Sequence, residues 1–252
     1  MHTPSSPTLL FLDTETTGIT EGRLIQVAYQ ARGGAAKSSA ADGAMHVEYF
    51  KPPVPIEIEA MAVHHITEKH VAAKPVFDGS DTHATLKALL ANSATVFVAH
   101  NAKFDLGVLA REGLPLAPQG RFICTMKVAQ SMYDLPQYKM QYLRYLWGIE
   151  DDGATAHDAE GDVAILEKVF DHMLADYLKG HDGTDEAAVI DAFAEISRNP
   201  TLLRRVGFGK YADMTFAELA AKDRGYLEWM GTLADKGDDF KYTVQYYLGV
   251  KA

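Results

Sequence analysis

The apolar run from Leu9 to Leu12 ends directly in two acidic side chains, Asp13 and Glu15. Four consecutive apolar residues predict a buried strand, and a strand projects the side chains at i and i+2 from the same face. Two neighbouring carboxylates repel each other unless one takes up a proton or a cation lies between them. The stretch therefore predicts half of a cation site at the end of a core strand, although an Asp-x-Glu pair taken alone is also typical of a solvated face.

Length and composition bound the class of protein. A chain of 252 residues fits one large domain, or a domain of about 180 residues with a small appendage. The apolar content of 47% is enough for a sizeable core. Residues 1–7 lack the basic and apolar stretches of a signal peptide, and no apolar run reaches the roughly 18 residues of a membrane span. Cys124 is the only cysteine, which excludes an internal disulfide and a cysteine-based zinc cluster. We expect a cytoplasmic protein with no membrane association.

The charge is negative overall and unevenly distributed. A net charge of −10 argues against a broad basic surface that coats duplex nucleic acid. Residues 1–200 carry 16 basic and 27 acidic side chains, whereas residues 201–252 carry 8 and 7. This change near Pro200 predicts a boundary, and a nucleic-acid partner would meet less repulsion from the C-terminal part.

Hydrophobic patterning predicts alternating strands and helices after the first strand. The small-residue stretch 33–43 indicates a hairpin loop without a chemical role. Residues 60–67, which include His64 and His65, are expected to form a loop. Further strands are expected at 23–32, 45–50, 95–99 and, at an edge, 122–125, and helices at 81–90, 125–132, 138–147, from 159 onward and at 186–196.

Two later segments also place acids at the ends of elements. With Asn101 as N-cap, Asp105 lies in the first turn of a helix that follows a strand, which is where open α/β sheets place their ligands. Taken alone, Asp105 could merely favour the helix dipole. With Asp158 as N-cap of the next acidic helix, His157 at N′ and Asp162 at N4 approach each other as in a hydrophobic staple.

Four carboxylates could therefore converge: Asp13, Glu15, Asp105 and Asp162. Oxygen ligands without cysteine favour Mg²⁺ or Mn²⁺ over zinc. We therefore expect a hard divalent cation as the cofactor.

The three segments together resemble a known family. Asp13-x-Glu15, His100-Asn101-x-x-Phe104-Asp105 and His157-x4-Asp162 match, in order and spacing, the motifs of the DEDDh exonucleases of the DnaQ-like superfamily. The resemblance covers about residues 8–178. It implies an α/β fold, namely a ribonuclease H-like mixed five-stranded sheet flanked by helices, with a small C-terminal helical appendage. The expected domains are an exonuclease domain at 1–180, a connecting segment at 181–200 and an accessory domain at 201–252.

The resemblance also implies roles for individual residues. The four carboxylates would hold two Mg²⁺ ions, for which Mn²⁺ can substitute, and His157 would take a proton from the attacking water. His64 falls on the family's substrate-side histidine, while His65 stands where relatives vary. The expected substrate-binding residues are Thr14, Thr16, Met61, His64, Asn101 and Phe104.

The implied reaction is 3′-to-5′ hydrolysis of DNA, single- or double-stranded, to nucleoside 5′-monophosphates in DNA repair or degradation. Two alternatives stay open: a 3′-to-5′ exoribonuclease, and a non-catalytic scaffold subunit of a polymerase complex. The expected partner is nucleic acid with a free 3′ end, and residues 201–252 could bind a protein. In that region helices are expected at 215–222, 225–233 and 240–248, whose aromatic residues form either a small core or a base-stacking surface: Tyr226, Trp229, Tyr242, Tyr246 and Tyr247.

Overall fold

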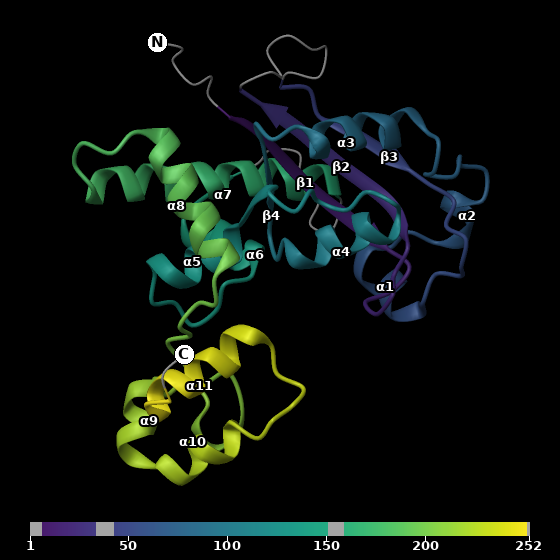
Figure 1. Cartoon of the computed structure of the whole chain (residues 1–252). Helices are drawn as coiled ribbons and strands as arrows, with labels where there is room; N and C mark the ends of the chain where they lie inside the picture. The colour runs from purple at the N-terminus through teal and green to yellow at the C-terminus, as the bar shows by residue number, and fades with distance from the viewer. Residues whose placement is uncertain (1–6, 34–42, 151–158, 251–252) are drawn as a thin grey trace.

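A mixed five-stranded sheet forms the centre of the molecule (Figure 1). The computed structural model describes residues 7–33, 43–150 and 159–250. The strand order is β3-β2-β1-β4-β5; β1 pairs antiparallel with β2 and parallel with β4. This confirms the predicted fold class. The strands are β1 Thr8–Thr16, β2 Leu24–Arg32, β3 His46–Tyr49, β4 Thr95–Ala99 and β5 Arg121–Cys124.

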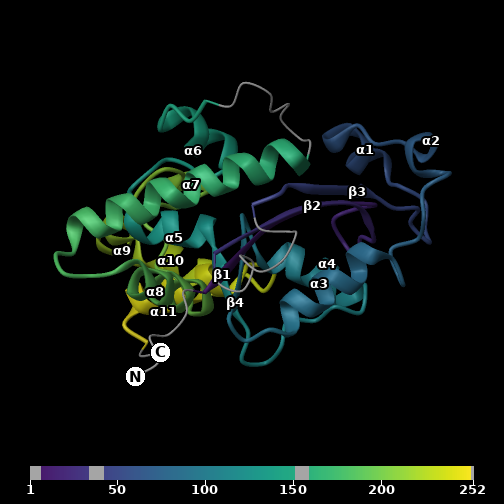
Figure 2. The same ribbon diagram turned by 90° about the horizontal axis from the view of Figure 1, so that it is seen from above.

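Helices cover both faces of this sheet (Figure 2). Because successive strand residues face opposite ways, Leu9 and Phe11 pack under the long helix α7, while Leu10 and Leu12 pack on the side of α3 and α4. The helices up to residue 198 are α1 Ile58–His64, α2 Glu68–Val71, α3 Asp81–Ala91, α4 Lys103–Arg111, α5 Thr125–Met132, α6 Met140–Leu146, α7 Ala159–Gly180 and α8 Glu186–Arg198. None of the described helices combines the length and apolar character that a bilayer crossing requires.

Arg32 fixes α7 over the sheet. Its guanidinium donates to Glu167 at 2.9 Å and to Asp171 at 2.7 and 2.9 Å, and it lies over the rings of Phe11 and Phe170. These contacts hold the middle of α7 against the sheet.

Helix α8 belongs to the core of the sheet domain, although it lies in the predicted connecting segment 181–200. Its buried face includes Val189 and Phe193, which join the cluster under α7. Its Ser197 accepts a hydrogen bond of 2.8 Å from the backbone N–H of Cys124 on the edge strand β5. The division into three domains stays a prediction, but the packed part of the sheet domain extends to residue 198.

Residues 201–248 form a separate lobe below the sheet in Figure 1. Its small core contains Phe216, Leu227 and Met230. Of the aromatic residues in question, Tyr226 and Tyr247 pack against this core, whereas Trp229 and Tyr246 are 47% and 55% exposed. The lobe consists of the short 3₁₀ helix η2 Gly209–Tyr211 and helices α9 Phe216–Lys222, α10 Arg224–Met230 and α11 Asp238–Leu248. We call it the C-terminal lobe.

Two local predictions were wrong. His64 ends helix α1 instead of lying in a loop, and His65 takes the left-handed conformation that terminates the helix. Asn101 is not an N-cap: its φ is +64°, and α4 begins after Ala102. Asp105 is therefore the third residue of α4, still within its first turn.

Candidate active site

The carboxylates of β1 meet Asp162 of α7 on one face of the sheet. Asp13 and Glu15 project on the same side as Phe11, which faces α7. One ligand oxygen from each of Asp13, Glu15 and Asp162 lies within 4.8 Å of the others. Three carboxylates from two elements distant in sequence therefore form one acidic cluster.

Asp162 is held in place by a neighbouring helix. It is 7% exposed, and the side-chain amide of Gln141 donates to its Oδ1 at 2.9 Å. Gln141 lies in α6, which packs against α7. This bond orients the carboxylate of Asp162, one ligand atom of which belongs to the cluster.

Asp105 reaches the cluster from the opposite face of the sheet. Helix α4 follows β4, which runs parallel to β1, so the start of α4 lies near the end of β1 that carries the acids. Asp105 is 2% exposed and accepts a hydrogen bond of 2.8 Å from the Thr14 hydroxyl. The site thus straddles the end of β1.

The cluster is electrostatically strained without a cation. Burial, followed by the charges of Asp105, Glu15 and Asp162, raises the pKa of Asp13 well above its ordinary value. Burial raises the pKa of Asp105 to about 7, although its hydrogen bond from Thr14 acts in the opposite direction. A set of hard oxygen donors whose charges oppose one another fits a divalent cation.

Three of the expected substrate-side residues lie around α1. Both ring nitrogens of His64 form hydrogen bonds with the backbone. Nδ1 accepts from the N–H of Ile66 at 3.0 Å, so the ring proton is on Nε2. Nε2 donates this proton to the carbonyl of Thr16 at 3.2 Å. Burial lowers the pKa of His64, consistent with this neutral form. His64 therefore ties α1 to the end of β1, next to Met61, which packs on a small cluster around Ile25.

The remaining expected residues differ in their surroundings. Thr14 supports Asp105 directly. Phe104 packs partly into the cluster on the α4 face, and Asn101 is exposed at the turn before α4. The predicted catalytic His157 and its neighbour Asp158 lie outside the described residues, so their predicted arrangement stays a prediction.

Two supporting residues were not predicted from the sequence. Gln141 was assigned only to a helix, since no spacing signal connects it with Asp162. His100 belongs to the second motif, but no role is predicted for it; it is half-buried, with Nδ1 3.0 Å from the hydroxyl of Thr125 and Nε2 2.9 Å from the carbonyl of Tyr138. Burial lowers its pKa to about 4, so it is neutral at physiological pH.

The fold and the acidic cluster define a nuclease-like architecture, and comparison with known proteins supplies the family. The chain belongs to the RNase_T exonuclease family, whose model matches residues 10–170. This confirms the predicted membership of the DEDDh, DnaQ-like exonucleases. A relative from Escherichia coli (strain K12), "Exodeoxyribonuclease 10", is 30% identical and aligns over 95% of this chain and 98% of its own. "DNA polymerase III subunit epsilon" of Rickettsia conorii is 26% identical over 73% of this chain and 81% of its own.

Solved structures agree with this assignment. A complex described as "Exonuclease X in complex with 5′ overhanging duplex DNA" matches with a TM-score of 0.51 and 26% identity, covering 75% of this chain and 99% of that one. Within the family, four segments of the sequence resemble exonuclease X: 60–67, 98–101, 123–127 and 208–211. The relative and the solved structure together confirm this similarity. E. coli exonuclease I bound to single-stranded DNA shares the fold, with a TM-score of 0.56 and 22% identity over 69% of this chain and 41% of that one.

Proposed function

We propose that the chain is a 3′-to-5′ exodeoxyribonuclease that uses Mg²⁺ and releases nucleoside 5′-monophosphates. The observation that carries the proposal is the convergence of Asp13, Glu15 and Asp162 with buried Asp105. Family membership makes the chain an exonuclease that depends on divalent metal. The choice of DNA is supported by the relative named exodeoxyribonuclease 10 and by the duplex DNA bound to exonuclease X.

The acids would hold two Mg²⁺ ions, with Mn²⁺ as a substitute. When bound, such ions supply a water of lowered pKa and stabilise charge on the leaving oxygen. The chain's own residues orient this site: Thr14 holds Asp105, and Gln141 holds Asp162. His157, with an ordinary pKa near 6.5, would accept the proton of the attacking water near neutral pH.

The substrate end would lie between α1 and the start of α4. Met61 and Phe104 would line the terminal nucleotide, and the backbone at Thr16 would lie near it. His64 would act by holding this wall in place, because both of its ring nitrogens are already bonded to the backbone. We further propose a cytoplasmic location and a role in DNA repair or degradation.

Degradation of end-labelled oligonucleotides tests this function. With a label at the 5′ end, single-stranded and duplex DNA should shorten one nucleotide at a time in Mg²⁺ and release 5′-monophosphates. Asp13→Ala should abolish the reaction, whereas Asp182→Ala, which removes an exposed acid from the loop before α8, should not.

Other outcomes would point elsewhere. Faster trimming of an RNA oligonucleotide of the same sequence would favour the exoribonuclease alternative. Substantial turnover by Asp13→Ala would contradict the metal assignment. No cutting of any substrate by the wild-type protein, together with binding to a polymerase subunit, would favour the scaffold.

A further inference from the structure

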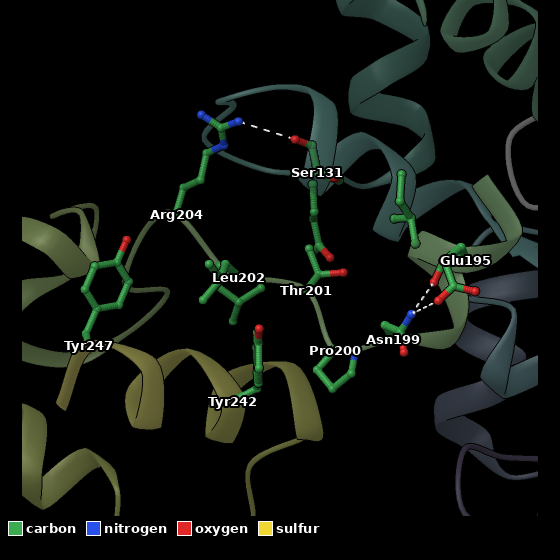
Figure 3. A pocket seen from close by; sticks show the side chains of 12 residues that line it. Ser131, Glu195, Asn199, Pro200, Thr201, Leu202, Arg204, Tyr242 and Tyr247 are labelled. Atoms are coloured by element: carbon green, nitrogen blue, oxygen red, sulfur yellow. Dashed lines mark hydrogen bonds between the residues drawn. The ribbon is translucent and has the colours of Figure 1, made fainter. Parts of the chain in front are cut away.

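A groove separates the sheet domain from the C-terminal lobe. One part, with a volume of about 330 Å³, lies between residues 135–138 of the sheet domain and residues 203–208 of the lobe. A second hollow of about 590 Å³ adjoins it and shares Gln130, Leu203 and Arg204 in its wall. Figure 3 shows this second hollow, with Tyr242 and Tyr247 reaching it from α11 and Arg204 at its side. The two hollows lie next to each other along the junction, and we call them together the groove.

Ion pairs hold the two walls of the groove together. Lys127 of α5 is 5% exposed; its ammonium contacts the carbonyl of Asn199 and lies 3.1 Å from Oδ1 of Asp239 at the start of α11. Arg205 donates two hydrogen bonds of 3.2 Å to the carboxylate of Asp134. A buried lysine with a charged partner and a bidentate pair fix the lobe on the sheet domain. The two walls of the groove are therefore held in fixed positions relative to each other.

The smaller part of the groove is lined by more basic than acidic side chains, whereas the second hollow has one of each, Arg204 and Glu195. Three cationic side chains and one acidic one, Asp213, line the smaller part, although the chain as a whole carries −10. The charge of Arg205 is neutralised by Asp134. Arg204 donates one N–H to the carbonyl of Ser131 at 3.3 Å, and its other N–H groups can still donate to a ligand. These charges favour an anionic occupant.

Lys236 is the cation best placed for such an occupant. Its ammonium lies 4.6 Å from the centre of the Phe208 ring, which orients it at the wall of the groove. It forms an ion pair with Asp235, at 3.4 Å, and that side chain is 73% exposed. A solvated acid neutralises a lysine only weakly, so the positive charge remains available.

Hydrogen bonds and an ion pair link the walls of the groove to the elements that carry the acids. Tyr138, which lines the groove, has its carbonyl oxygen 2.9 Å from Nε2 of His100. Gln141, three residues later, donates a hydrogen bond to the carboxylate of Asp162. On the other side of the site, Lys103, two residues before Asp105, forms a 3.3 Å ion pair with Asp238 of the lobe. The loop and the lobe that form the groove are thus tied to the elements that carry the acids.

We infer that this groove binds the single-stranded segment of the substrate that lies on the 5′ side of the nucleotide being removed. Lys236 and Arg204 contact its phosphates, and Tyr242, half-buried in the second hollow, provides a face for a base. The inference rests on the proposed function and deepens it, because it assigns the C-terminal lobe to substrate binding.

Binding without hydrolysis tests the phosphate contact. The full-length protein in EDTA is titrated against fluorescent oligothymidylates of 2 and 12 nucleotides at 50–200 mM salt. Each lost phosphate contact lowers the salt slope of log affinity by about 0.7 for single strands, which corresponds to about 2.6-fold over this fourfold range. Lys236→Gln should lower the slope for the 12-mer by this amount, and Lys236→Arg should restore it. The matched control is Lys241→Gln, which removes an exposed lysine of α11 outside the groove and should leave the slope unchanged.

A second variant tests the base contact. Tyr242→Leu keeps apolar bulk but removes the ring, and loss of base stacking should weaken binding of the 12-mer about fivefold or more, with an unchanged melting temperature. The loss should be larger for the 12-mer than for the dinucleotide. Equal salt slopes for Lys236→Gln and Lys241→Gln would overturn the inference and leave the groove to a protein partner. Because the assay needs no cutting, failure of the proposed reaction would be seen separately.

Discussion

Replacing Asp105 by asparagine should stabilise the metal-free protein, and this stabilisation should depend on pH. In the folded chain the pKa of Asp105 is raised to about 7, whereas in the unfolded chain it is near the ordinary 3.8. One pKa unit corresponds to about 1.4 kcal/mol, so ionising this carboxyl in the fold costs up to about 4 kcal/mol. Between pH 4 and 7 the folded chain holds a proton that the unfolded chain has lost, so the free energy of unfolding falls as the pH rises. Asparagine stays neutral and retains an oxygen that can accept the Thr14 hydrogen bond.

The assay is thermal unfolding in EDTA at pH 5, 6, 7 and 8. Asp105→Asn should melt above the wild type at pH 8 by up to about 8–16 °C, because 1 kcal/mol shifts the melting temperature of a protein of this size by about 2–4 °C. The difference should shrink towards pH 5 and should be reduced at pH 8 when Mg²⁺ is added, since the cation offsets the same charge in the wild type. The control Asp182→Asn should melt like the wild type throughout. A variant less stable than the wild type at pH 8, or a difference that does not change with pH, would refute the reasoning.

Three further outcomes are expected. His157→Ala should lower the rate about 10²- to 10⁴-fold with little change in metal affinity, and the wild-type rate should fall as the pH drops through the imidazole pKa; identical pH profiles would reject the role of a base. Lys127→Met should remove a buried ammonium that contacts both Asp239 and the carbonyl of Asn199, and should destabilise the protein by about 1–3 kcal/mol in urea unfolding, with faster proteolysis near residues 199–203, whereas the exposed Lys241→Met should change neither. In NMR titrations His100 should stay neutral down to about pH 4, because desolvation of its ring opposes protonation; titration near pH 6.5 would contradict this desolvation.

Most of the sheet could be predicted because its strands are short apolar runs. The strand at 95–99 and the helix at 125–132 have the predicted bounds. The strand is rich in β-branched and aromatic residues, and the helix has apolar residues at helical spacing. Helix α1 was missed because seven residues after a proline-rich stretch give too little periodicity. The exposed face of this helix, which includes Ile58 at 75% exposure, adds no hydrophobic pattern.

The acids of the site could be predicted, but their supporting contacts could not. Asp13, Glu15 and Asp162 each lie next to an apolar run in the sequence. These three of the four predicted ligands form one close cluster in the structure. The bonds from Thr14 to Asp105 and from Gln141 to Asp162 join residues 91 and 21 positions apart, so they depend on tertiary structure that no local pattern encodes.

The order of the acids along the chain has a consequence for biosynthesis. Asp13 and Glu15 lie in the first strand, whereas Asp162 lies in α7, one of the last helices of the sheet domain. A chain emerging from the ribosome exposes the first acids long before α7 exists to cover their face of the sheet. The cluster that would bind metal therefore closes only when nearly the whole domain has been made. The growing polypeptide would thus be unable to cut nucleic acid near the ribosome, and activity would begin only with the nearly complete protein.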